Sequence, residues 1–295
     1  MEMNVVLERR LTRMRRLVST LVVAVVVLVA GQALAGSPAN GRFVKAGGHR
    51  LYLRCAGKGR PVVLLEAGLG DWSRGWKAVL SRSKTVGSTV CAYDRYGLGR
   101  SGRYTGSRPI AKVASDLHTL VSKAQLRGPY VLGGASIGGL VVRYYAKQYP
   151  KQVAGMVLFD SVPDDWDQYL GMSVFAASGE RLNITTVTTS LRASDRLGSK
   201  PLVVLEAGDE SYLEGVTHRS DLRDYWDPRQ HELAGISTSS LFAVATGSPH
   251  WIQSARPNLS AEAIRMVVAS VRSKKALPTC AASKLPKLGA ACEPG

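Results

Sequence analysis

One segment, residues 129–150 (PYVLGGASIGGLVVRYYAKQYP), constrains the fold of this chain more than any other part of the sequence. It begins with a short apolar run, which is typical of a buried strand. Gly134 and Gly138 stand two residues before and two residues after Ser136. Apolar residues then recur at helical spacing as far as Pro150, where a helix is expected to end. The pattern predicts a strand, a sharp turn and a helix, with Ser136 at the apex of the turn.

A serine in such a turn is well placed for nucleophilic chemistry. Its hydroxyl stands clear of the sheet, beside a helix N-terminus whose unpaired N–H groups favour a developing negative charge. The bare G-x-S-x-G pattern is weak in a chain with 30 glycines, and it also fits a serine in a tight glycine turn that has no chemical role. The predicted strand before it and helix after it favour Ser136 as a nucleophile.

The segment resembles the nucleophile elbow of the α/β-hydrolase fold family, and two further segments match that family. The run from Asp94 to Ser101 (DRYGLGRS) is similar to a loop that follows an early strand of these proteins. His250 follows the last predicted strand, 241–245, and precedes a predicted helix at 259–273, where the family places its catalytic base. The resemblance covers about residues 42–273. It implies an α/β fold with a mostly parallel central sheet, helices on both faces and a short lid insertion.

The hydrophobic pattern between these motifs agrees with such a sheet. Near-continuous apolar runs are typical of parallel strands that are covered on both faces. Between residues 164 and 200 the pattern is irregular, which predicts a small lid between two strands rather than an ordinary long connection. The expected strands lie at 42–45, 50–54, 61–66, 89–94, 130–133, 153–159, 201–206 and 241–245, and further helices are expected at 73–82 and 111–125.

The resemblance implies a catalytic triad of Ser136, His250 and a carboxylate. The family usually places the acid after the strand expected at 201–206, where Asp209 stands slightly earlier than the usual position. In a minority of the family the acid follows the strand after the nucleophile helix, and Asp160 stands there. Because geometry decides which carboxylate reaches the base, both remain candidates, and we favour Asp160.

The resemblance also implies two backbone N–H groups that bind the oxyanion of the reaction. We expect them at Leu69, in the loop after the strand at 61–66, and at Ile137, directly after the nucleophile. That strand usually ends in His-Gly in this family, whereas this chain has Glu66-Ala67-Gly68. Backbone donors do not require the histidine. Asp94 is expected to brace its loop rather than to take part in the reaction.

The N-terminus has the features of a signal peptide. Residues 1–35 contain a cluster of arginines, an apolar run at 17–30 and the small-residue pattern Ala33–Ala35. The apolar run is short for a membrane span, so we expect cleavage before Gly36 rather than an uncleaved anchor. Residues 36–295 then form one hydrolase domain, and the protein is secreted.

Four cysteines behind an export signal predict disulfides. None of them forms a C-x-x-C pair, so a zinc site is not expected. Of the three pairings we favour Cys55–Cys91 with Cys280–Cys292. The family fold would bring the first pair together on two early strands, and the second pair would close a short loop in the Pro/Lys-rich tail at 274–295.

The formal net charge is +17, but the chain shows neither a block of consecutive basic residues nor a nucleic-acid motif. We therefore expect a solvated basic surface with weak affinity for an anionic cell envelope, no nucleic-acid partner and a monomer. The expected function is hydrolysis of a small carboxylic ester by a lipase-like serine esterase that needs no metal or organic cofactor. The alternatives are an aminopeptidase or amidase of the same fold, and a hydrolase-fold binding or sensing protein with little turnover.

Overall fold

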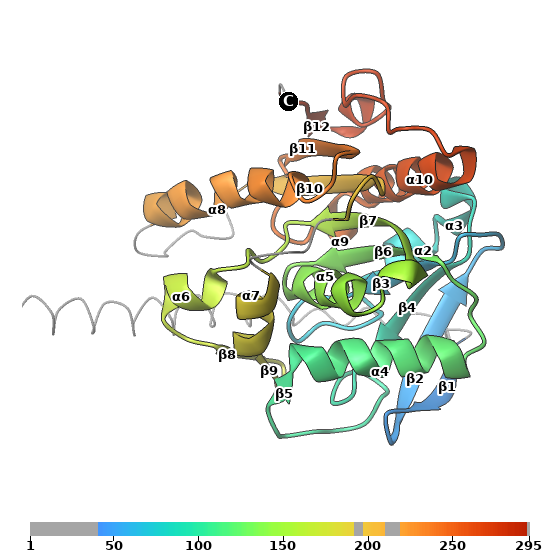
Figure 1. Ribbon diagram of the computed structural model, residues 1–295, viewed down its shortest axis with the longest axis vertical. Coiled ribbons are helices and arrows are strands. Elements are labelled where there is room, and N and C mark those ends of the chain that lie inside the picture. Colours follow the sequence, from blue (N-terminus) through green and yellow to red (C-terminus); the bar gives the residue numbers. More distant parts are fainter. Residues whose placement is uncertain (1–40, 192–196, 210–218, 294–295) are drawn as a thin grey trace, which may run out of the picture.

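The computed structural model describes residues 41–191, 197–209 and 219–293, so the predicted signal peptide lies outside the described residues. Within this part of the chain, a sheet of nine strands has the order β1-β2-β4-β3-β6-β7-β10-β11-β12 (Figure 1). Strands β4 to β11 of this order run parallel, whereas β1, β2 and β12 are antiparallel to their neighbours. The strands are β1 (Gly41–Ala46), β2 (His49–Ala56), β3 (Val63–Glu66), β4 (Val90–Asp94), β6 (Tyr130–Ala135), β7 (Val153–Phe159), β10 (Leu202–Gly208), β11 (Ser240–Thr246) and β12 (Ala290–Ala291).

Helices cover both faces of the sheet because successive side chains of a strand point to opposite sides. In β7, Met156 and Leu158 belong to the core on one face, and Val157 and Phe159 belong to the core on the other. The first core is closed by α4 (Ile110–Lys123) and α5 (Ile137–Gln148), and the second by α2 (Lys77–Leu80), α3 (Ser83–Val86), α9 (Ile252–Ala255) and α10 (Pro257–Ser273). The α/β-hydrolase fold expected from the sequence is therefore present.

The helix expected at 73–82 is shorter than predicted. Residues before Lys77 form turns instead, since Gly75 donates its N–H to the carbonyl of Trp72 and Lys77 to that of Arg74. Trp76 directly precedes the helix and is fully buried, where its ring packs edge-on against Phe159. The first turn of the expected helix is therefore absent, and Trp76 packs into the core in front of a shorter helix.

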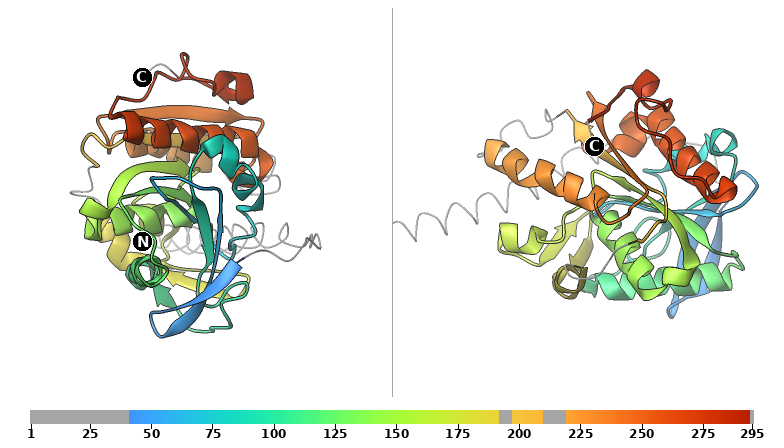
Figure 2. Two further views of the ribbon diagram at one scale, coloured as in Figure 1. Left: turned by 90° about the vertical axis from the view of Figure 1, so that its right-hand side faces the viewer. Right: turned by 45° about the horizontal axis from the view of Figure 1, so that its top comes forward.

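The segment expected as a lid forms a small substructure, which we call the cap. Its described residues contain α6 (Trp166–Leu170), the hairpin β8–β9 (Val174–Ala177 and Glu180–Asn183) and α7 (Thr185–Leu191). The hairpin forms a separate small sheet because β9 pairs with β5 (Arg108–Pro109). Helix α8 (Arg219–Ala234) lies beside α6, and Figures 1 and 2 show these helices together at one end of the molecule.

Two disulfides connect the favoured cysteine pairs. Cys55 on β2 is bonded to Cys91 on β4, where the two residues are direct partners across the strands. Cys280 is bonded to Cys292 in the tail, around the short 3₁₀ helix Pro286–Leu288. Of the helices that the structure describes, none combines the length and the apolar character that a membrane span requires.

Candidate active site

Ser136 occupies the sharp turn between β6 and α5. Its φ of 53° and ψ of −126° lie in a region that residues other than glycine rarely adopt. The turn is held against the end of β7. The Ser136 N–H donates to the carbonyl of Phe159 over 3.0 Å, and the Val162 N–H donates to the carbonyl of Ser136 over 3.1 Å. The strained turn therefore presents Ser136 directly beside the residue that follows Phe159.

The two flanking glycines are required by close backbone contacts. A Cβ atom on Gly138 would lie 2.6 Å from the carbonyl oxygens of both Glu66 and Ala67. A Cβ atom on Gly134 would lie 2.7 Å from the carbonyl oxygen of Gly138. Any side chain here would push α5 away from β3 and β6, and Ser136 would move with the helix.

Asp160 is the residue that follows Phe159, and its carboxylate is bonded to His250. Oδ2 of Asp160 lies 2.6 Å from Nδ1 of His250. Because a carboxylate only accepts hydrogen bonds, the imidazole donates from Nδ1. Oδ1 of Asp160 accepts the indole N–H of Trp226 over 2.9 Å and the backbone N–H of Ala207 over 3.2 Å. The Asp160 side chain is 1% exposed and that of His250 is 20% exposed, so the acid is buried and the imidazole reaches the surface of the site.

The alternative acid, Asp209, follows β10 at the same edge of the sheet. It is half-buried, and its backbone N–H donates to the carbonyl of Ser248 over 2.9 Å, in the loop that leads to His250. Nδ1 of His250 already donates to Asp160. Of the two candidate acids, Asp160 is therefore the one whose carboxylate is seen to accept the hydrogen bond of Nδ1.

The expected donors are the backbone N–H of Ile137, directly after the serine, and that of Leu69, in a nearby loop. Among the residues that the structure describes, neither N–H donates to an acceptor. Ile137 begins helix α5, so its N–H is free of the helical ladder and lies at the positive end of the helix dipole. The loop of Leu69 is close to the nucleophile, since a Cβ atom on Gly68 would lie 3.4 Å from Cβ and 4.0 Å from Oγ of Ser136.

The comparison with known proteins agrees with this fold. A family model described as serine aminopeptidase, S33, matches residues 57–201, which contain Ser136 and Asp160. The structure also matches that of a thermophilic esterase from Thermogutta terrifontis, with a TM-score of 0.58 and 20% sequence identity over 79% of this chain and 99% of that chain. The chain belongs to the α/β-hydrolase fold family.

Curated relatives of this α/β-hydrolase carry differing names. YqjL from Bacillus subtilis is 23% identical over 207 residues, which cover 67% of this chain and 79% of that protein. A non-heme chloroperoxidase from Streptomyces lividans is 36% identical over 93 residues, and the match spans 32% of each chain. The similarity thus establishes the family but does not identify the reaction.

A second carboxyl group lies buried near the Asp160 side chain of the hydrolase. Glu206 on β10 is 2% exposed. Burial, together with the hydrogen bond and the charge of Asp227 and the charge of Asp160, raises the pKa of Glu206 from 4.5 to about 10. Glu206 is therefore a neutral acid near pH 7, because three neighbouring carboxyl groups cannot all be ionised in a buried site.

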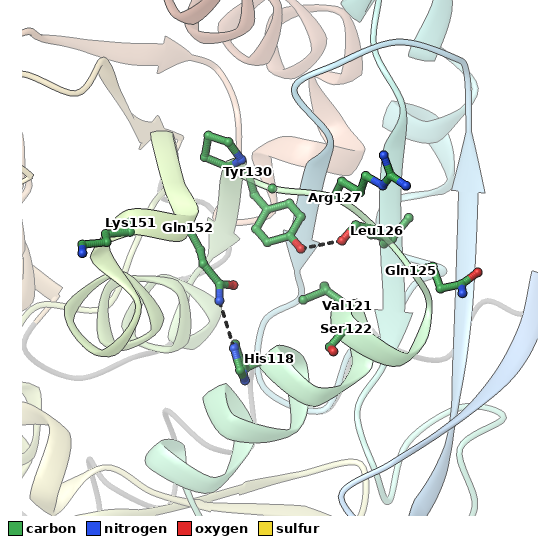
Figure 3. A pocket seen from close by; sticks show the side chains of 11 residues that line it. His118, Val121, Ser122, Gln125, Leu126, Arg127, Tyr130, Lys151 and Gln152 are labelled. Atoms are coloured by element: carbon green, nitrogen blue, oxygen red, sulfur yellow. Dashed lines mark hydrogen bonds between the residues drawn. The ribbon is translucent and has the colours of Figure 1, made fainter.

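The α/β-hydrolase also has a pocket at the opposite end of β6, shown in Figure 3. There the amide of Gln152 lies 3.0 Å from Nε2 of His118, and the Tyr130 hydroxyl donates to the carbonyl of Leu126. Tyr130 is the first residue of β6, whereas Ser136 follows the last one, so this pocket and the nucleophile lie at opposite ends of the strand. His118 also stacks on the ring of Tyr149.

Two residues with evident contacts to the site were not assigned a role from the sequence. Trp226 belongs to none of the sequence motifs, and Arg95 belongs to the DRYGLGRS run without a role of its own. Asp94 has the bracing role expected for it, because its carboxylate accepts the N–H groups of Ser73 and Arg100. No group of three or more His, Cys, Asp or Glu able to hold a metal ion occurs within the described ranges.

Proposed function

We propose that this protein is a serine hydrolase that cleaves carboxylic esters with Ser136, His250 and Asp160. The observation that carries the proposal is the 2.6 Å hydrogen bond between Asp160 and His250, formed beside a serine held in a strained strand-to-helix turn. The Ser136 N–H is bonded to Phe159, the residue next to Asp160, so nucleophile and acid are fixed to the same strand end. A serine, a base and a buried acid of this kind are the parts that acyl transfer requires.

The proposed reaction proceeds through an acyl-enzyme. Nε2 of His250 takes the hydroxyl proton of Ser136 while Oγ attacks the ester carbonyl carbon. The N–H groups of Leu69 and Ile137 bind the resulting oxyanion, and Asp160 stabilises the imidazolium. When the intermediate collapses, the C–O bond to the leaving alkoxide breaks and the imidazolium gives the alkoxide its proton. Water then attacks the acyl group with His250 as base, which releases the acid and restores the serine.

Aromatic side chains near the base favour an ester with apolar groups. The rings of Trp226 and His250 lie 6.2 Å apart, and Trp226 packs edge-on against Trp166 of the cap. Tyr169 and Tyr225 stack at 3.8 Å and extend this cluster. Trp166 and Tyr225 are buried, whereas Trp226 is half-buried and Tyr169 is exposed. The two accessible rings can pack against an apolar acyl or alkyl chain, which the hydrophobic effect favours.

An aminopeptidase is the second candidate, because the matching family model carries that description. It requires an ionised carboxylate for the substrate amine, and the sequence offers Glu66 and Glu206. Glu66 is 1% exposed and accepts hydrogen bonds from Arg95 and Tyr93. Glu206 is buried, with its pKa raised to about 10 by burial and by Asp227. Because neither carboxyl offers a charge to a ligand, we favour the ester.

The test combines active-site labelling with two substrates. The wild type, Ser136→Ala and the control Ser122→Ala, which changes an exposed serine beside the remote pocket, are treated with a fluorophosphonate probe. Each is also assayed on p-nitrophenyl butyrate and on an aminoacyl p-nitroanilide. We expect labelling and esterase activity in all but Ser136→Ala. Residual labelling of Ser136→Ala would refute the nucleophile, faster anilide cleavage would favour the peptidase, and a wild type inert in all assays would favour the binding protein.

We also propose that the protein acts outside the cytoplasm as a monomer after removal of residues 1–35. Two disulfides are typical of proteins that fold in an oxidising compartment. N-terminal sequencing of the exported protein is expected to begin at Gly36. Its net positive charge would give weak, salt-sensitive binding to an anionic envelope.

A further inference from the structure

Arg95, which directly follows β4, is buried between three segments of the chain. Its side chain is 1% exposed. Nη1 donates to Glu66 Oε1 and to the carbonyl of Ala67, both over 2.7 Å, and Nη2 donates to the carbonyl of Gly68 over 2.7 Å. The guanidinium is therefore hydrogen-bonded to the loop that carries the Leu69 N–H.

Further contacts of this guanidinium come from the cap. Glu180, the first residue of β9, accepts hydrogen bonds from Nε and Nη2 of Arg95, each over 2.6 Å. Oε2 of Glu180 also accepts the backbone N–H of Gly70 over 2.9 Å. The cap hairpin is therefore attached both to Arg95 and directly to the loop of Leu69.

These contacts fix the two peptide planes on either side of Leu69. The carbonyl of Gly68 and the N–H of Leu69 belong to one planar trans peptide and point in opposite directions. When Arg95 holds the Gly68 carbonyl, it therefore also sets the direction of the Leu69 N–H. The next peptide plane contains the Gly70 N–H, which Glu180 holds.

The buried guanidinium of Arg95 and the carboxylates of Glu66 and Glu180 are opposite in charge, so the cation and the two anions stabilise one another. Burial raises the pKa of Glu66, although the charge of Arg95 opposes this shift. Burial alone would lower the pKa of Arg95, but the charge and hydrogen bonds of Glu180 raise it well above its ordinary value. Removal of Glu180 would leave a buried cation with unused donors, which is costly enough to make the loop rearrange.

We propose that Arg95 and Glu180 are positioning residues that orient the Leu69 N–H, so that oxyanion stabilisation depends on a correctly seated cap hairpin. This inference rests on the proposed esterase function for its catalytic consequence. Its structural part, the attachment of the loop at 67–70 to β9, is independent of any reaction. On this proposal the cap supports the catalytic machinery through its hairpin.

The kinetic experiment compares Glu180→Ala and Glu180→Gln with the same two changes at Glu262. Glu262 is a matched control because it is 4% exposed and bonded to an arginine, Arg265, but lies on α10. With p-nitrophenyl butyrate, Glu180→Ala is expected to lower kcat about 100-fold with KM little changed, as for loss of one oxyanion donor. Glu180→Gln keeps an acceptor for the Gly70 N–H and should recover part of this loss.

A trifluoromethyl ketone serves as a second readout because its adduct with the serine carries an oxyanion. Its inhibition constant should rise in Glu180→Ala by the same factor as kcat/KM falls. The Glu262 variants should keep the wild-type values of both. A folded Glu180→Ala with wild-type kcat, or with a raised KM alone, would overturn the proposal. If Glu180→Ala does not fold, the same criteria apply to Glu180→Gln.

Hydrogen exchange measured by mass spectrometry tests the attachment without any substrate. Amides in the loop at 67–70 should exchange faster in the Glu180 variants, while the Glu262 variants should show the wild-type rate there. Unchanged exchange in this loop would refute the attachment. If the wild type cleaves no ester, the proposed function fails, and the exchange result still decides whether Glu180 orders the loop.

Discussion

Replacement of Trp226 by phenylalanine removes one hydrogen bond from the carboxylate of Asp160 and leaves the surrounding packing largely in place. The indole N–H donates to Oδ1 over 2.9 Å, on the side of the carboxylate opposite to His250. A phenyl ring can keep the edge-on contact with Trp166, whose ring centroid lies 5.2 Å away. The substitution therefore tests the hydrogen bond itself more than the aromatic cluster.

The expected loss follows from the strength of that bond and from how much of it acts in the transition state. A hydrogen bond to a charged group contributes about 1.5–3 kcal/mol. The Ala207 N–H still donates to the same oxygen over 3.2 Å, so the Asp160 carboxylate keeps part of its orientation. Only the part that is stronger in the transition state, when the imidazolium forms, affects the rate. We therefore expect about 1.4 kcal/mol, which is a tenfold fall in kcat/KM.

The assay is steady-state hydrolysis of p-nitrophenyl butyrate, with thermal unfolding as a check on folding. Trp251→Phe is the matched control. Trp251 directly follows His250 in the chain, and the centroids of the two rings lie 5.9 Å apart. We expect this control to stay within about twofold of the wild type, since the hydrogen bonds that Asp160 accepts within the described residues come from His250, Trp226 and Ala207. A Trp226→Phe variant with wild-type kcat/KM, or with no larger loss than the control, would show that the indole does not orient Asp160.

Three further predictions concern the acid, the buried carboxyl group and a disulfide. Asp160→Asn should lower kcat about 10⁴-fold, whereas Asp209→Asn should change it little, and the reverse result in ester assays would move the acid to Asp209. Because the pKa of Glu206 is raised from 4.5 to about 10 by burial and by Asp227, its stabilising contribution is complete below pH 4.5 and is lost as the pH rises through 10. Urea unfolding of Glu206→Gln should therefore show a flatter dependence on pH between 5 and 9 than the wild type, and equal slopes would contradict the shift. Replacement of Cys55 and Cys91 together by serine should lower the free energy of unfolding by about 2–4 kcal/mol, and an unchanged urea midpoint would argue against a stabilising bond.

The elements and motifs that depend on local patterns could be predicted from the sequence. Strand β7 has the predicted bounds, because its uninterrupted apolar run is buried on both faces of the sheet. The turn at Ser136 and the loop of His250 were also located, since each follows a predicted strand and precedes a predicted helix. Here the local pattern and the tertiary fold agree.

Contacts between distant segments could not be predicted in the same way. Asp160 and Asp209 both follow parallel strands, so the sequence places both at one sheet edge, and only side-chain direction distinguishes them. Glu180 bonds to Gly70 across 110 residues, and no periodicity relates the two positions. The indole of Trp226 reaches Asp160 from α8 across 66 residues. Such pairings depend on how the cap and α8 pack onto the sheet.

The short strand β12 has a consequence for the solubility of this protein. It pairs with Val244 and Ala245 at the end of β11, and the Cys280–Cys292 bond fastens the tail that carries it. Without the tail, that part of β11 would present unpaired N–H and C=O groups, to which a strand of another molecule could add. A two-residue strand protects this edge and is itself too short to recruit a partner. The tail therefore guards against aggregation at the strand end that leads to His250.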